Sequence, residues 1–116
     1  MRACFKLWSV VAVGLAFLSA SLRAEFVYVA NAGSNNVSAY RIAESGALTP
    51  VAGSPFPAGS DPRSLAVDLF RRFVCVANAL SNNVSVYRIG ANGGLTLVAG
   101  SPFPAGSDPR SLAFSP

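Results

Sequence analysis

The sequence predicts an all-β fold built from repeated units of four short antiparallel strands. The chain has 116 residues, and the stretch VAGSPFPAGSDPRSLA begins once at Val51 and again, unchanged, at Val98, so the repeat period is 47 residues. A period of roughly 20 to 50 residues is typical of solenoids, propellers and arrays. Proline, glycine and valine recur through each copy and disfavour helical repeats of similar length. The repeat therefore indicates tandem β-units.

The alignment of the two copies extends over almost the whole region after the N-terminal segment. Residues 26–69 align with 73–116 as 44 pairs without a gap, of which 33 are identical. We therefore divide the chain into repeat 1, residues 26–72, and repeat 2, residues 73–116. Four antiparallel strands in about 40 to 50 residues are the content of one β-propeller blade. The fold prediction is an incomplete β-propeller of about two repeats.

Repeat 1 contains four candidate strands. Residues 26–31 (FVYVAN) are apolar on both faces and predict a buried strand, and residues 36–42 (NVSAYRI) alternate with a period of two. Residues 48–52 predict an edge strand, because Pro50 cannot donate to a ladder. The prolines of 54–62 predict an extended connection before a fourth strand at 64–68. Repeat 2 predicts strands at 73–78, 83–89 and 95–99, and residues 111–114 predict the start of a third unit.

Residues 1–24 have the three-part plan of a secretory signal peptide. A basic start is followed by 12 apolar residues at 7–18 and by small residues. Cleavage after Ser21 and cleavage after Ala24 both remain open. An uncleaved anchor is disfavoured, because 12 helical residues span about 18 Å of a hydrocarbon core about 30 Å thick. We expect a periplasmic, secreted or cell-surface protein that meets the membrane only during export.

The composition after the leader excludes several classes of function. The formal charge of the whole chain is +4, but residues 25–116 carry six arginines and five acidic residues, a net charge of +1. This balance predicts no binding to nucleic acid. Histidine is absent and Cys75 is the one cysteine after the leader, so we expect no disulfide, metal or cofactor. Cys75 lies mid-strand and is interpreted as a small buried hydrophobe.

Four segments of repeat 1 resemble a known family. YVAN at 28–31, SNNVSAYRI at 34–42, GALTPVAGSPF at 46–56 and PRSLAVD at 62–68 resemble the YVTN-type repeats of the seven-bladed lactonase β-propeller family, which includes 6-phosphogluconolactonase. The resemblance covers the chain after the leader. It implies a truncated propeller: one whole blade, three strands of the blade before it and one strand of a third.

The resemblance also implies an order of strands within a blade. Counted from the innermost strand outward, the order is 64–68, 73–78, 83–89 and 95–99. The family commonly has Pro, a polar residue and Gly after the inner strand, whereas this chain has Leu69, Phe70 and Arg71. If position 71 requires a positive φ, arginine there costs about 1 kcal/mol relative to glycine.

Family enzymes bind their substrate at one face of the central channel, which the loops leading into the inner strands help to line. By this resemblance the candidate ligand-binding residues are Asp61, Arg63, Asp108 and Arg110, and no catalytic residue is assigned. An arginine fork suits a carboxylate or phosphate group of a sugar-acid lactone. In the alternative interpretation each Asp caps the turn and each Arg bridges to the next blade. The unchanged repetition favours this structural role, because active sites usually break repeat symmetry.

Two functions follow from the resemblance. The first is an exported fragment of a lactonase-like propeller whose intact form hydrolyses a sugar-acid lactone such as 6-phosphogluconolactone, the segment alone being inactive. The second is a non-catalytic propeller outside the cytoplasm that binds a protein or a carbohydrate. Two repeats leave sheet faces and edges that a lone chain does not bury, so the sequence also predicts self-association.

Overall fold

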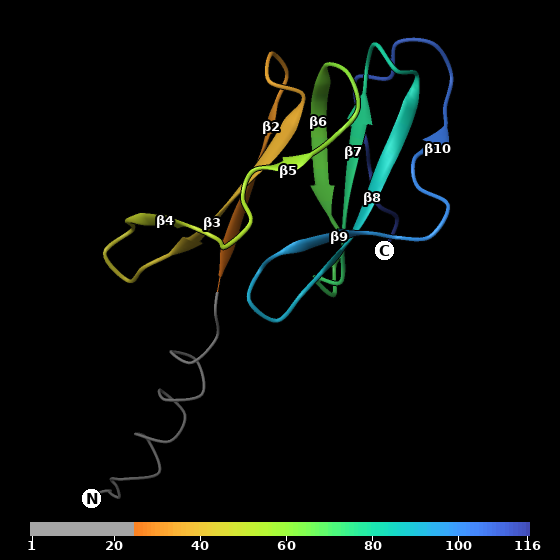
Figure 1. Cartoon of the computed structure of the whole chain (residues 1–116). Helices are drawn as coiled ribbons and strands as arrows, with labels where there is room; N and C mark the ends of the chain where they lie inside the picture. The colour runs from red at the N-terminus through yellow and green to blue at the C-terminus, as the bar shows by residue number, and fades with distance from the viewer. Residues whose placement is uncertain (1–24) are drawn as a thin grey trace, which may run out of the picture.

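The computed structural model describes residues 25–116, which form two antiparallel β-sheets that lie side by side (Figure 1). The predicted leader, 1–24, lies outside the described residues. The first sheet, here the first blade, contains β2 (Phe26–Asn31), β3 (Asn36–Ile42), β4 (Leu48–Pro50) and β5 (Phe56–Pro57). The second sheet, here the second blade, contains β6 (Pro62–Val67), β7 (Phe73–Asn78), β8 (Asn83–Ile89), β9 (Leu95–Leu97) and β10 (Phe103–Pro104).

The order of strands in the second blade confirms the prediction. β6 pairs with β7, β7 pairs with β8, and β8 pairs with both β9 and β10. The bounds of β2, β3, β7 and β8 agree with the sequence prediction. β6 begins at Pro62, two residues earlier than predicted, and contains an irregularity between Pro62 and Ser64. The first blade has the same arrangement without an inner strand among the described residues.

The outer strand of each blade is shorter than predicted and is interrupted. β4 and β5 are two pieces that pair with the two halves of β3, so the segment 54–62, which was predicted as an extended connection, also contributes a short strand. Between the pieces, the N–H of Val51 donates to the carbonyl of Ala39, and the N–H of Ala39 donates to Ser54 Oγ, each at 2.9 Å. The serine hydroxyl thus replaces a backbone acceptor, which lets the outer strand leave the ladder and return to it.

The predicted inner strand at 111–114 does not form. These residues have no strand pairing, whereas the same Ser-Leu-Ala sequence lies within β6. β6 is a strand because β7 lies beside it, and residues 111–114 have no such partner among the described residues. A strand needs a neighbour to satisfy its backbone groups, so local sequence was insufficient here.

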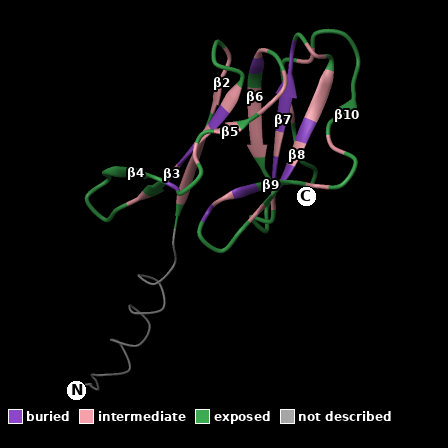
Figure 2. Ribbon diagram, viewed as in Figure 1, coloured by how far each residue is buried: buried purple, intermediate pink, exposed green. Residues whose placement is uncertain are grey.

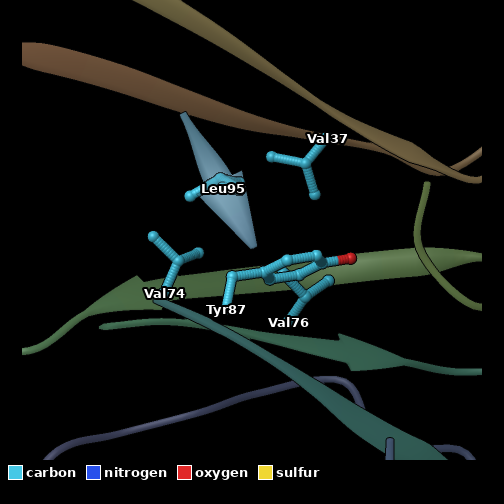
Figure 3. Packing of buried hydrophobic residues seen from close by; sticks show 5 residues of the cluster. All are labelled: Val37, Val74, Val76, Tyr87 and Leu95. Carbon is cyan, nitrogen blue, oxygen red and sulfur yellow. The ribbon is translucent and has the colours of Figure 1, made fainter. Parts of the chain in front are cut away.

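The hydrophobic core lies between the two blades (Figures 2 and 3). Val37 of the first blade faces Leu95 and Tyr87 of the second, with Val74 and Val76 beneath the tyrosine ring. All five side chains are buried. Because side chains alternate along a strand, β7 directs Val74 and Val76 toward the first blade and Phe73, Cys75 and Ala77 toward the opposite face. Burial therefore depends on contact between blades.

Two tyrosine hydroxyls cross this interface in opposite directions. Tyr28 of the first blade donates to the carbonyl of Gly93 at 2.8 Å, and Tyr87 of the second blade donates to the carbonyl of Pro57. Gly93 has a φ of 88°, and a Cβ at this position would overlap the ring of Phe26. Only glycine combines this backbone conformation with so close an approach. The Phe26 ring of the first blade therefore packs directly against the hairpin turn of the second blade.

The turn between β6 and β7 contains the expected strained residue. Arg71 has a φ of 57°, so the positive φ considered from the sequence is present. Asp68 supports the turn by accepting hydrogen bonds from the N–H groups of Arg72 and Phe73. Burial alone would raise the pKa of Asp68, but these bonds and the Arg72 side chain together lower that pKa below its ordinary value.

Cys75 is half-buried in the middle of β7. Burial raises the pKa of its thiol, and the Asp68 carboxylate adds to the effect. The thiol is therefore protonated at neutral pH, which agrees with its interpretation as a small hydrophobe.

Candidate functional site

The residues selected from the sequence lie at one end of the two blades, which we call the Asp61 rim. It consists of the loops 58–61 and 105–108 and the turns 31–36 and 78–83. The loop 58–61 is bonded to both blades: the N–H of Asp61 donates to Asn35 Oδ1 at 2.9 Å, and the N–H of Gly59 donates to Asn78 Oδ1 at 3.2 Å. The structure therefore holds Asp61 in a defined position.

The two Asp-x-Arg motifs at this rim have the same geometry. Asp61 and Asp108 have φ values of 56° and 53°, a left-handed conformation that aspartate tolerates better than most residues. The Nε of Arg63 donates to Asp61 Oδ2 at 2.7 Å, and the Nε of Arg110 donates to both carboxylate oxygens of Asp108 at 3.1 and 3.0 Å. Each arginine is thus paired with the aspartate two residues before it.

The surroundings of the two pairs differ. The Asp61 side chain is 13% exposed and that of Asp108 is 55% exposed, because only the first pair lies between two blades. The hydrogen bond and charge of Asp61 raise the pKa of Arg63 further above its ordinary value, and the charge of Asp108 adds to this effect. The charge of Asp108 therefore acts on the guanidinium of the first motif.

This arrangement limits the chemistry of the rim. Each guanidinium uses Nε for its aspartate and retains two terminal nitrogens that can donate to a carboxylate or phosphate oxygen. Each aspartate also cancels the charge of its arginine, so an anion gains little net attraction. Among residues 25–116 no group of three or more metal-ligating side chains occurs. The geometry defines a polar surface and does not by itself define a catalytic centre.

The sequence analysis did not select the asparagines that position these loops. Asn35 and Asn82 each accept the N–H of the aspartate 26 residues later, Asp61 and Asp108 respectively, at 2.9 Å. Asn35 and Asn82 also have positive φ values, so each ends its own turn while fixing the next loop. Their identical spacing from the aspartates in both repeats is the signal that would have predicted the contact.

A hollow lies at the opposite end of the blades, which we call the Asp68 rim. That rim consists of the turns 43–47, 68–72 and 90–94. The hollow has a volume of about 480 Å³ and lies between the blades. Its lining is mostly apolar and consists of Glu25, Phe26, Tyr28, Ile42, Val67, Arg71, Ile89, Gly90 and Ala91. None of the four residues selected from the sequence contributes to it. No helix among residues 25–116 is long and apolar enough to cross a membrane.

The fold and the repeated rim define a β-propeller protein. The model of the family described as "Lactonase, 7-bladed beta-propeller" matches residues 12–114. The chain belongs to this family, as the resemblance of its repeats predicted. The matched range begins within the predicted leader. No curated protein matches the chain.

Solved structures show the same fold. A putative 6-phosphogluconolactonase from Bacteroides fragilis has a TM-score of 0.70 and 22% identity, over 78% of this chain and 25% of that one. A protein from Lactobacillus plantarum has a TM-score of 0.67 and 25% identity, over 74% of this chain and 25% of that one. The periplasmic gluconolactonase of Pseudomonas aeruginosa has a TM-score of 0.58 and 21% identity, over 76% of this chain and 28% of that one. This chain thus spans about a quarter of the length of these proteins.

Proposed function

We propose that this chain is part of an exported lactonase-like propeller whose intact form hydrolyses a sugar-acid lactone. The observation that carries the proposal is membership of the seven-bladed lactonase family over residues 12–114. Two similar solved structures bear gluconolactonase names, one of them a phosphogluconolactonase described as putative. The substrate class we propose is therefore a gluconolactone, with or without a phosphate group.

The residues of the Asp61 rim are proposed to bind the substrate. The terminal nitrogens of Arg63 and Arg110 would donate to a carboxylate or phosphate group, while Asp61 and Asp108 hold each guanidinium in place through Nε. The paired geometry fixes the direction of the donors, although it reduces the net charge. These residues would bind and orient the lactone, and the group that activates water is left unassigned.

The test is lactone hydrolysis by a complete seven-bladed protein that contains these repeats. We expect the 116-residue chain alone to be inactive and the complete protein to hydrolyse 6-phosphogluconolactone or gluconolactone. Replacing Arg63 and Arg110 by alanine should raise KM about tenfold or more, since two charge-assisted hydrogen bonds are lost. Arg72→Ala is the matched control, because Arg72 is also paired with an aspartate but lies at the Asp68 rim. Unchanged kinetics in the double variant would contradict the proposed site.

The second candidate is a non-catalytic propeller that binds a protein or carbohydrate outside the cytoplasm. It is favoured by the unchanged repetition of the Asp-x-Arg motif and by the internal pairing of both arginines. Absence of turnover with both phosphorylated and unphosphorylated lactones, together with correct folding of the complete protein, would favour this candidate over the enzyme.

Export is proposed from the leader at 1–24. Alkaline phosphatase fused after residue 116 should be active in a bacterial host only when the apolar run 7–18 is intact. Equal activity after deletion of residues 7–18 would contradict export by this leader.

A further inference from the structure

The hairpin turn 90–94 contains the one Asn-Gly pair of the sequence, Asn92-Gly93. The two residues differ in exposure, since Asn92 is exposed and Gly93 is buried against the first blade. An asparagine followed by glycine is especially prone to spontaneous deamidation, because glycine has no Cβ to hinder attack by its nitrogen on the asparagine side chain. The turn therefore carries a candidate modification site where the two blades meet.

The reaction at such a pair consumes only water. The backbone nitrogen of Gly93 loses its proton and attacks Cγ of Asn92, a new C–N bond forms, the bond from Cγ to Nδ2 breaks, and ammonia leaves. Water then opens the five-membered succinimide ring. Cleavage of the bond from Cγ to the Gly93 nitrogen gives aspartate, whereas cleavage of the bond from the Asn92 main-chain carbonyl carbon to that nitrogen gives isoaspartate. Isoaspartate adds one carbon atom to the main chain.

The folded turn restrains both reacting groups. The N–H of Gly93 donates to the carbonyl of Gly90 at 3.0 Å, and Asn92 Oδ1 accepts the N–H of Gly94 at 3.1 Å. The N–H of Gly90 also donates to the carbonyl of Gly94 at 2.8 Å and closes the turn. The attacking nitrogen keeps its proton while it donates, and the amide group is held toward Gly94. Attack therefore requires these hydrogen bonds to open.

The first blade controls how often the turn opens. The hydroxyl of Tyr28 donates to the carbonyl of Gly93 at 2.8 Å, and the ring of Phe26 lies so close to Gly93 that a Cβ there would overlap it. Opening the turn moves Gly93, so it breaks the tyrosine hydrogen bond and displaces the ring. A reaction that proceeds only from an open state has a rate proportional to the population of that state. Contact with the first blade therefore slows the reaction.

The first blade has the same turn without the reactive amide. The N–H of Gly46 donates to the carbonyl of Ala43, and the N–H of Ala43 donates to the carbonyl of Ala47, each at 2.9 Å. Ser45 occupies the position of Asn92, and its Oγ accepts the N–H of Ala47 at 3.4 Å. A hydroxyl oxygen thus replaces the amide oxygen in this turn. Serine has no side-chain carbonyl carbon and forms no succinimide, so the repeat itself supplies an unreactive equivalent.

We propose that Asn92-Gly93 is a site of spontaneous deamidation, which is protected while the two blades are in contact and reacts when their interface opens locally. The isoaspartate product lengthens the main chain beside Gly93, so the Gly93 carbonyl and the surface under Phe26 no longer fit the first blade together. Deamidation thereby converts a transient opening of the interface into a lasting one. The site behaves in this way whether or not the propeller hydrolyses a lactone.

The first test follows deamidation of Asn92 by peptide mass spectrometry in the complete protein at mildly alkaline pH. We expect the folded protein to react at least about tenfold more slowly than the same protein unfolded in urea, because only the open turn reacts. Tyr28→Phe should accelerate the reaction about fivefold, as expected for one lost hydrogen bond. Tyr40→Phe is the matched control and should react at the parent rate, because within residues 25–116 the Tyr40 hydroxyl makes no bond to the turn.

Circular dichroism establishes that each variant is folded before the rates are compared. If Tyr28→Phe does not fold, Phe26→Leu makes the same comparison, because it reduces the contact with Gly93 and keeps an apolar side chain. Equal rates in the folded and unfolded parent would overturn the proposal. A rate in the folded interface variant equal to that of the parent would overturn it as well.

The second test measures the effect of the product on the interface. The complete protein, aged until most of Asn92 has reacted, should unfold at a lower urea concentration than fresh protein. Fresh Asn92→Asp controls for the added charge on a normal main chain, and aged Asn92→Ser controls for ageing elsewhere in the protein. Both controls should unfold like the fresh parent. Equal urea midpoints for the aged parent and aged Asn92→Ser would show that the product does not loosen the interface.

Discussion

Leu95 and Leu48 occupy equivalent positions in the two repeats, yet Leu95 is 8% exposed and Leu48 is 48% exposed. The same contrast separates Phe56, which packs against the core, from Phe103, which is 42% exposed. The polar rim follows the pattern, since Asp61 is more buried than Asp108. In every pair the better-buried residue faces the other blade. The neighbouring blade therefore determines burial, and the sequence of a repeat does not determine it alone.

Truncating the two leucines should give the largest difference between the blades. Leu95→Ala should lower the free energy of unfolding by about 3 kcal/mol, because it leaves a cavity between the blades. Leu48→Ala should cost less than about 1 kcal/mol in the dilute chain, where Leu48 is half-exposed. Urea unfolding of both variants at one low chain concentration measures the difference. Equal losses would show that packing within a sheet dominates over packing between blades.

Substitutions at the two equivalent hairpin glycines distinguish the cost of steric contact from the cost of backbone conformation. Gly46 and Gly93 have φ values of 91° and 88°, so alanine costs roughly 1 kcal/mol at either position for the backbone alone. Gly93→Ala must also displace the Phe26 ring, and we expect it to cost about 2 kcal/mol more than Gly46→Ala. Thermal unfolding of the two variants tests this. A similar loss for both would mean that Phe26 moves aside freely.

Replacing Arg71 by glycine should stabilise the second blade. Arg71→Gly should raise the free energy of unfolding by about 1 kcal/mol, because glycine adopts a φ of 57° without the clash of a Cβ. Arg72→Gly is the neighbouring control: its backbone has no positive φ, and its side chain bonds Asp68, so it should lose stability. If both changes destabilise the chain, the Arg71 side chain contributes contacts that outweigh its strain.

The turn at Asp68 should make the free energy of unfolding depend on pH. We expect this effect to be smaller than those of the substitutions above. The pKa of Asp68 is lower in the folded chain than its ordinary value, so the carboxylate stabilises the fold above about pH 4. This contribution should disappear as the pH falls through the ordinary value toward the lower, folded one. The urea midpoint measured from pH 6 down to about pH 3 should therefore fall less in Asp68→Asn than in the parent. Parallel curves would exclude Asp68 as a contributor.

Strand type and order could be predicted from the sequence, because alternation and turn residues are local signals. The bounds of β7 and β8 could be predicted from the residue patterns FVCVAN and NVSVYRI alone. The return of the outer strand at Phe56 could not be predicted, since it depends on a side-chain bond from Ser54 to a different strand. The missing strand at 111–114 shows the same limit, because pairing requires a partner as well as a sequence.

The place of the candidate residues in the fold could be predicted, but their internal contacts could not. Asp61 and Arg63 could be placed at the loops before the inner strands because the repeat defines where those strands begin. The pairing of Arg63 with Asp61 depends on the left-handed conformation of Asp61. That conformation is fixed by Asn35, which lies 26 residues away and carries no obvious functional signal.

The interrupted outer strand has a consequence for how this protein meets strands of other molecules. Its pieces are three and two residues long and contain Pro57 and Pro104, so the outer edge presents few backbone groups for a further strand. The edge of β2, by contrast, is a regular strand of six residues. Addition of a further strand is therefore disfavoured at the outside of each blade. The interrupted outer strand thus protects the outside of each blade from edge-to-edge aggregation.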